Sequence, residues 1–239
     1  MMTAHDVVVV GGGLGGLTVA ALLAARGVDV CLLERQSFVG GCATPIQKLD
    51  YTFDPTFALD SLWEPGQLHQ RIFAELPASP PETKVLSPSY AVRLPDATNV
   101  IVAPDEQQFL HAIANFFPEC ASAALSFYQR AAELSDALSH AAERFPHLAS
   151  LSRLEKARLL IAEPRLSRAS ATYLTKAVAS DLNAIGHRFK CFIDSQLLSF
   201  AGVPSERCSW GRAALTLTIA RRSAYAVKGR RSRSLQRSA

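Results

Sequence analysis

Residues 7–17 read Val-Val-Val-Val-Gly-Gly-Gly-Leu-Gly-Gly-Leu, and this stretch decides the fold that we predict. The four β-branched residues Val7–Val10 are typical of a strand that is buried on both faces. Gly11, Gly13 and Gly16 fit the G-x-G-x-x-G spacing, and strong helix formers follow. In that motif the first glycine permits a tight turn and the second lets a pyrophosphate approach the backbone. The third allows a helix to pack closely on the strand.

The downstream sequence supplies the context that this motif requires. Gly27 is a suitable stop for the helix, and residues 28–33 predict a second strand that ends at Glu34. This acid lies about 20 residues after the glycines, where a dinucleotide fold places one on the ribose hydroxyls. Strand, glycine turn, helix, strand and acid in this order predict a dinucleotide-binding βαβ unit.

Two other interpretations of the N-terminal region fail. Residues 7–25 contain no charged side chain and are long enough to resemble a membrane span. However, the glycines among residues 11–16 would weaken a helix through the bilayer. A secretory signal would need a basic cluster before this stretch, and His5 and Asp6 stand there instead.

Composition and charge exclude further classes of protein. Of the 239 residues 49% are hydrophobic and 19% are charged, which is typical of a soluble globular chain. The net charge of +4 is accounted for by the four arginines among residues 229–239. Because the rest of the chain is neutral, we expect no nucleic-acid partner.

The cysteines indicate the compartment. Five cysteines are scattered along the chain, without a C-x-x-C pair or a histidine at zinc-site spacing. An odd, scattered set fits reduced thiols, so we expect a cytoplasmic protein without a metal site.

Three short patterns carry a family resemblance: Glu34-Arg35, Gly-Gly-Cys-Ala at residues 40–43, and Phe53-Asp54. Together with the βαβ unit they resemble the flavin-dependent amine oxidase superfamily, and within it the carotenoid desaturase and isomerase branch related to phytoene dehydrogenase. The resemblance implies FAD as cofactor and places the second glycine pair and Cys42 on its diphosphate and ribityl region. The residues that we expect to bind the cofactor are Gly11, Gly12, Gly13, Leu14, Gly15, Gly16, Glu34, Arg35, Gly40, Gly41 and Cys42.

Later segments fit the same branch more loosely. Residues 94–102 predict two short strands around a turn. Asp105, with Gln108 three residues on, predicts the N-cap of a helix. Further likenesses to the family occur at residues 116–119, 192–198 and 225–229.

A region rich in Ala, Leu, Ser and Arg, from about residue 119 to 220, predicts several amphipathic helices. One apolar stripe is typical of ordinary core, but it also fits a lid that opens toward a membrane. Its members are Leu151, Leu154, Ala157, Leu159 and Leu160. The cations beside it, which would suit solvent or anionic headgroups, are Arg153, Lys156, Arg158, Arg165 and Arg168.

We therefore predict an α/β chain with a Rossmann-like FAD/NAD(P)-binding βαβ domain (residues 1–75). A mostly helical α+β substrate domain (76–220) is inserted after it, and a disordered basic tail (221–239) follows. In the resembled family a long second half begins near Gly229, where this chain has only an Arg/Ser-rich stretch. We expect a truncated chain, with a frameshift as one hypothesis and a native basic tail as the alternative. Truncation would leave an unpaired sheet edge, exposed apolar surface and weak flavin retention.

The resemblance implies hydride removal from, or isomerisation of, a lipophilic polyene, with peripheral membrane contact. No catalytic acid or base can be named, since the six histidines are scattered and form no triad. Asp54 and Asp194 are the carboxylates nearest to family landmarks, although Pro55 stands where the family has a glycine soon after. The alternatives are an inactive fragment that retains only the ADP-binding unit and, less favoured by the second glycine pair, an NAD-dependent dehydrogenase.

Overall fold

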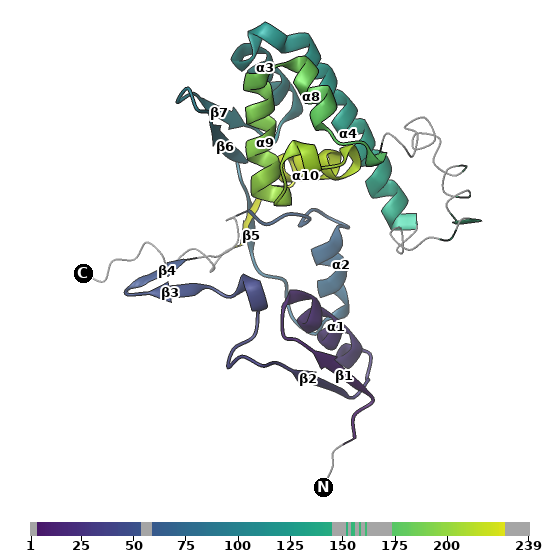
Figure 1. The fold of residues 1–239 in the computed structure, drawn as a ribbon. Helices are drawn as coiled ribbons and strands as arrows, with labels where there is room; N and C mark the ends of the chain where they lie inside the picture. The colour runs from purple at the N-terminus through teal and green to yellow at the C-terminus, as the bar shows by residue number, and fades with distance from the viewer. Residues whose placement is uncertain are drawn as a thin grey trace. The chain divides into compact units, whose positions relative to one another are not determined.

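The structure is a computed structural model that describes residues 4–53, 59–144, 152, 154, 155, 158, 161 and 174–227. The chain divides into two compact units. The first combines Met1–Val85 with Tyr225–Ala239, and the second comprises Leu86–Ala224 (Figure 1).

The first unit begins with the predicted βαβ arrangement. Strand β1 (Val7–Val10) leads into helix α1 (Leu14–Ala25), and strand β2 (Val30–Leu33) returns parallel to β1. Gly27 follows the helix with φ of +83°, a conformation that favours glycine and ends the helix where the sequence predicts. The glycine turn therefore lies between a strand and a helix, as a dinucleotide fold requires.

The prediction that β1 is buried on both faces is wrong for the described residues. The side chains of Val8 and Val10 are 53% and 82% exposed, and no residue of α1 is buried. In the part of the chain that the structure describes, β1 pairs only with β2. A strand with one neighbour and one covering helix leaves its other edge and face uncovered.

The rest of the first unit is built from short elements. A hairpin follows the second glycine pair, and the last strand pairs antiparallel with a strand far earlier in the sequence. These elements are η1 (Gly41–Ala43), β3 (Ile46–Lys48), β4 (Tyr51–Phe53), α2 (Leu68–Glu75), β5 (Thr83–Val85) and β8 (Tyr225–Val227).

The prediction of a disordered tail from residue 221 is wrong at its start. Arg221 and Arg222 form the last turn of a helix, and Tyr225–Val227 is strand β8, paired with β5. The strand is specified by a partner some 140 residues away, which a local pattern cannot reveal. Residues 228–239 lie outside the described part of the chain.

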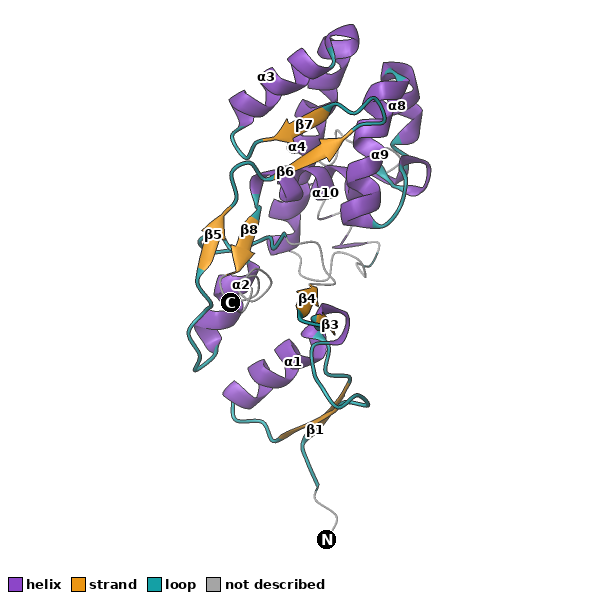
Figure 2. Cartoon of the chain, turned by 90° about the vertical axis from the view of Figure 1, so that its left-hand side faces the viewer, coloured by secondary structure: helices purple, strands orange, loops and turns teal. Residues whose placement is uncertain are grey.

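The second unit packs a hairpin against one side of a cluster of helices, and Figure 2 shows the paired strands β6 and β7 beside α3 and α9. The predicted hairpin is present, but its first strand ends at Arg93, before the predicted range, and residues 94–98 form the turn. The Asp105 side chain accepts the Gln108 N–H at 2.8 Å as the predicted N-cap. Helices also follow residues 116–119 and span residues 192–198. Its elements are β6 (Tyr90–Arg93), β7 (Asn99–Val102), α3 (Glu106–Phe116), η2 (Pro118–Cys120), α4 (Ala121–Arg144), α8 (Ala179–Ile185), α9 (His187–Ala201), η4 (Ser205–Arg207) and α10 (Trp210–Arg222).

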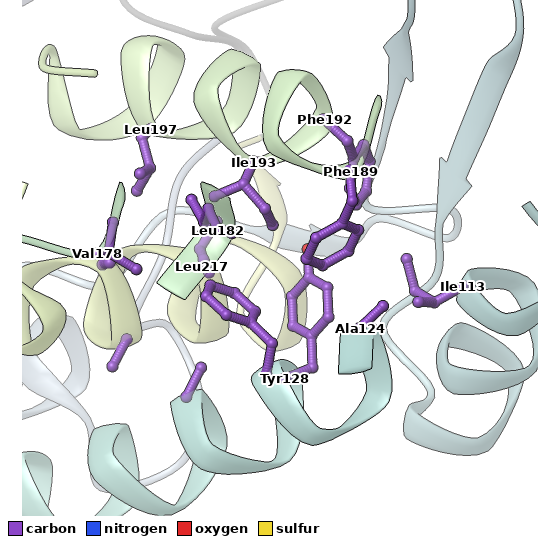
Figure 3. Close-up of a cluster of buried hydrophobic side chains, with 14 of the residues drawn as sticks. Ile113, Ala124, Tyr128, Val178, Leu182, Phe189, Phe192, Ile193, Leu197 and Leu217 are labelled. Carbon is purple, nitrogen blue, oxygen red and sulfur yellow. The ribbon is translucent and has the colours of Figure 1, made fainter. Parts of the chain in front are cut away.

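The core of the second unit is aromatic. The ring of Phe189 on α9 lies edge-on to those of Phe117 and Phe127, with centroids 5.3 and 5.6 Å away. Figure 3 shows Phe189 pointing toward Tyr128 of α4, whose ring centroid is 6.1 Å away. Phe189 is fully buried, and α10 contacts both α4 and α9, so the three helices share one core.

Two predicted features fall largely outside the described residues. Of the apolar stripe at residues 151–160 and the cations beside it, only Leu154 and Arg158 are described, and both are exposed. Neither the core nor the membrane-facing interpretation is tested by two residues. Among the helices that the structure describes, none is long and apolar enough to cross a bilayer.

Candidate dinucleotide-binding site

The glycine turn depends on the absence of two side chains. Gly11 leaves strand β1 with φ of +104°, and its N–H donates to the Leu33 carbonyl at 2.7 Å, which extends the pairing of β1 and β2. A β-carbon at Gly16 would stand 1.9 Å from the Gly11 carbonyl oxygen. The turn therefore requires an unusual backbone angle at one glycine and close contact at the other.

The start of helix α1 is open to an anion. Gly13 is the N-cap and offers no side chain to the helix, and no acidic residue lies in the first turn. A β-carbon at Gly13 or Gly15 would meet no described atom within 4 Å. Since the first N–H groups of a helix lack intrahelical acceptors and carry partial positive charge, this turn fits the diphosphate of a dinucleotide.

Glu34 lies directly after β2 and faces the glycine turn. Its Oε2 accepts the Gly12 N–H at 2.6 Å, and its Oε1 accepts the Gln36 N–H at 2.8 Å. The hydrogen bonds from Gln36 and then Gly12 hold the pKa of the Glu34 carboxyl below its usual range, so the side chain is ionised at neutral pH. An ionised carboxylate keeps lone pairs that can accept ribose hydroxyls.

The second glycine pair lies against the first glycine segment. The Gly40 N–H donates to the Gly12 carbonyl at 2.7 Å, and Gly13 and Gly40 form a parallel β-bridge. Gly41 has φ of +58°, and a β-carbon there would lie 3.1 Å from the Gly13 α-carbon. Two glycine segments that are about 25 residues apart in the sequence thus form one backbone surface.

The structure divides the expected site residues into two groups. Those that form the joined backbone surface are Gly11, Gly12, Gly13, Gly16, Glu34, Gly40 and Gly41. Those that are exposed beside it are Leu14, Gly15, Arg35 and Cys42.

Val39 and Thr44 support the second glycine pair and were not expected from the sequence. The Thr44 hydroxyl donates to the Val39 carbonyl at 3.2 Å, which closes the loop around the pair. A β-carbon at Gly40 would stand 2.8 Å from that hydroxyl oxygen, and one at Gly12 would stand 3.1 Å from the Val39 side chain. A valine and a threonine near glycines carry no distinctive sequence signal.

No catalytic constellation appears among the described residues. Asp194 accepts hydrogen bonds from the Lys190 ammonium at 2.5 Å and the Ser205 N–H at 2.8 Å. Burial raises the pKa of Asp194, but these bonds outweigh it and leave the pKa lowered. Asp194 therefore joins α9 to η4, while Asp54 lies outside the described residues. Within the described ranges no group of acidic, histidine or cysteine side chains could hold a metal.

Comparisons with known proteins agree with this geometry. A family model described as an NAD(P)-binding Rossmann-like domain matches residues 9–76. The carotenoid 3,4-desaturase of Haloarcula japonica is 30% identical over 49% of this chain and 24% of its own length. Prolycopene isomerase 2 of an Oncidium hybrid cultivar is 27% identical over 82% of this chain and 32% of its own length. This chain therefore spans less than a third of either relative.

A solved structure extends the likeness of the fold. The crystal structure of an oxidoreductase from Methanosarcina mazei superposes with a TM-score of 0.53, over 92% of this chain and 44% of that chain. At 18% identity this match concerns the fold alone. The resemblance predicted from the sequence is confirmed as distant homology.

Proposed function

Because this chain is a distant homologue of the N-terminal part of carotenoid desaturases and prolycopene isomerases, we propose that it carries the ADP-binding part of an FAD-dependent oxidoreductase. The proposal separates into two steps. The first concerns the nucleotide that the described backbone would hold, and the second concerns the reaction that a bound flavin would serve.

The observation that carries the proposal is the junction of the two glycine segments at Gly12, Gly13 and Gly40. A single glycine turn serves any dinucleotide, whereas a second glycine pair held against it lengthens the backbone surface available to a diphosphate. This length favours FAD over NAD, as we inferred from the sequence.

The residues have distinct tasks in this proposal. The turn from Gly11 to Gly16 would hold the diphosphate at the start of α1, and Glu34 would accept the ribose hydroxyls. Gly40, Gly41 and Cys42 would extend the surface toward the ribityl chain, with Leu14 and Arg35 exposed beside it. A flavin bound here would supply the hydride-accepting chemistry.

The proposed reaction acts on CH–CH bonds of a lipophilic, polyene-like molecule, by desaturation or isomerisation. It is supported by the identity of the two relatives, a carotenoid 3,4-desaturase and a prolycopene isomerase. A substrate of this kind partitions into lipid, so we propose a cytoplasmic protein that contacts a membrane peripherally.

A second candidate function is an ADP-binding unit without chemistry of its own. The exposure of Val8 and Val10 favours it, because the described part of the sheet offers no enclosed, dry site for a flavin ring. This candidate has the same nucleotide site as the first, but the chain would not hold the isoalloxazine ring for chemistry.

Absorbance and calorimetry of the purified 239-residue chain test both candidates. Binding of ADP that is abolished by Gly13→Val supports the nucleotide site, since the added side chain would occupy the space where the diphosphate approaches. Flavin absorbance that survives gel filtration favours the oxidoreductase, and ADP binding without flavin retention favours the second candidate. A chain that binds neither nucleotide contradicts both.

A further inference from the structure

The Gly12 backbone is held from two sides by groups outside the glycine turn. Its N–H donates to the Glu34 carboxylate at 2.6 Å, and its C=O accepts the Gly40 N–H at 2.7 Å. Gly12 is buried, and a β-carbon there would stand 3.1 Å from Glu34 Oε2. The residue in the middle of the turn thus connects the end of β2 to the second glycine pair.

The Glu34 carboxylate is itself anchored. Its second oxygen accepts the Gln36 N–H at 2.8 Å, so both oxygens are bound by backbone groups. Charge-assisted hydrogen bonds of this kind are stronger than those between neutral groups. The carboxylate therefore fixes the position of the Gly12 peptide relative to β2.

We propose that Glu34 is a positioning residue for the diphosphate-binding backbone: by holding the Gly12 N–H it keeps both glycine segments in register. This role rests on the proposed nucleotide site and is additional to any contact with ribose. It assigns the Gly12 N–H to Glu34 rather than to a phosphate oxygen.

The direction in which pyrophosphate affinity changes on mutation separates a positioning role of Glu34 from a ribose-binding role. Inorganic pyrophosphate has no ribose, so a ribose contact contributes nothing to its binding. Removing the negative charge of Glu34 also removes repulsion toward an anion. If Glu34 only contacts ribose, Glu34→Gln binds pyrophosphate as well as, or better than, the wild-type chain. If Glu34 positions the backbone, the variant binds pyrophosphate more weakly.

The experiment is a titration of the full chain with pyrophosphate, followed by NMR. We expect Glu34→Gln to weaken binding about tenfold, because an amide has one acceptor oxygen for the two N–H groups that the carboxylate accepts, and its NH2 group would face the other N–H. The matched control is Glu75→Gln, which removes another carboxylate of the same unit, one that pairs with Arg26 at 2.6 Å. We expect the control to bind as the wild type does. Equal or tighter binding by Glu34→Gln would overturn the proposal.

Amide hydrogen exchange tests the same role without a ligand. In the wild-type chain the Gly12 and Gly40 amides should be protected, and Glu34→Ala, which has no acceptor, should expose both while leaving amides of β1 protected. Unprotected Gly12 in the wild type, or protection that survives Glu34→Ala, would overturn the positioning role. A wild-type chain that binds neither ADP nor pyrophosphate contradicts the proposed function instead, and the exchange result then decides the role of Glu34.

Discussion

Gly16 lies so close to Gly11 that a β-carbon on residue 16 would stand 1.9 Å from the Gly11 carbonyl oxygen. Real β-carbons do not approach a heavy atom within 3.0 Å, and the contact is to backbone rather than to a side chain that could move. Helix α1 therefore packs on the end of β1 only because residue 16 has no side chain.

We predict that Gly16→Ala destabilises the first unit by at least about 1–3 kcal/mol, since the helix must move away from the strand. Urea unfolding followed by circular dichroism measures the loss. Gly15→Ala is the matched control in the same turn of α1, because its β-carbon would meet no described atom within 4 Å. The control should be neutral or slightly stabilising, as alanine favours helix. Equal stability of the two variants would contradict the packing.

Phe189 is the centre of the aromatic cluster in the second unit, with ring contacts to Phe117, Phe127, Tyr128 and Phe192. Phe189→Ala should cost about 3–5 kcal/mol because it removes a fully buried ring. The matched control is Leu198→Ala on the same helix, whose side chain is 52% exposed. Thermal or urea unfolding should show a much smaller loss for the control, and similar losses would argue against the cluster as core.

Asp105 should stabilise helix α3 through its side chain. Because its carboxylate accepts the Gln108 N–H at 2.8 Å, Asp105→Ala should lower the free energy of unfolding by about 1 kcal/mol. Asp105→Asn keeps an acceptor oxygen at the same place and should retain most of that stability. An alanine variant as stable as the wild type would show that the cap is not formed in solution.

The stability that Asp96 contributes at the hairpin turn should depend on pH. The Arg188 hydrogen bond, with help from Thr98, lowers the pKa of Asp96 from 3.8 to about 2. A lowered carboxyl pKa stabilises the fold above the unfolded value, and the effect is lost as pH falls from about 4 toward 2. Wild type and Asp96→Asn should therefore differ in urea midpoint at pH 6 and converge near pH 2. A difference that is constant with pH would contradict the pairing.

The sequence predicts the βαβ arrangement at the start of the first unit, but not the short elements that follow it. Strand, turn, helix and second strand follow from apolar runs and from glycine spacing, which act over a few residues. The position of Glu34 after β2 also follows from spacing. Its hydrogen bond to the Gly12 N–H does not follow from spacing, because the motif assigns the acid to the ribose hydroxyls. The motif does not specify which backbone groups of the chain the acid contacts.

The features that the sequence does not predict are set by residues that are far apart in the chain. The exposure of Val10 is set by which strands lie beside β1, and a run of four valines is equally compatible with one neighbour or two. Strand β8 exists because β5 pairs with it, and residues 225–227 alone read as the start of a tail. Burial and long-range pairing are properties of the assembled fold.

The central claim is that the described backbone holds the ADP half of a flavin dinucleotide. The most direct measurement compares the dissociation constants of ADP and FAD for the purified full chain by calorimetry. We predict that both bind and that Gly13→Val abolishes both, because the added side chain would occupy the space where the shared diphosphate approaches. Failure of ADP to bind, or binding of ADP and FAD that Gly13→Val leaves unchanged, would contradict the claim.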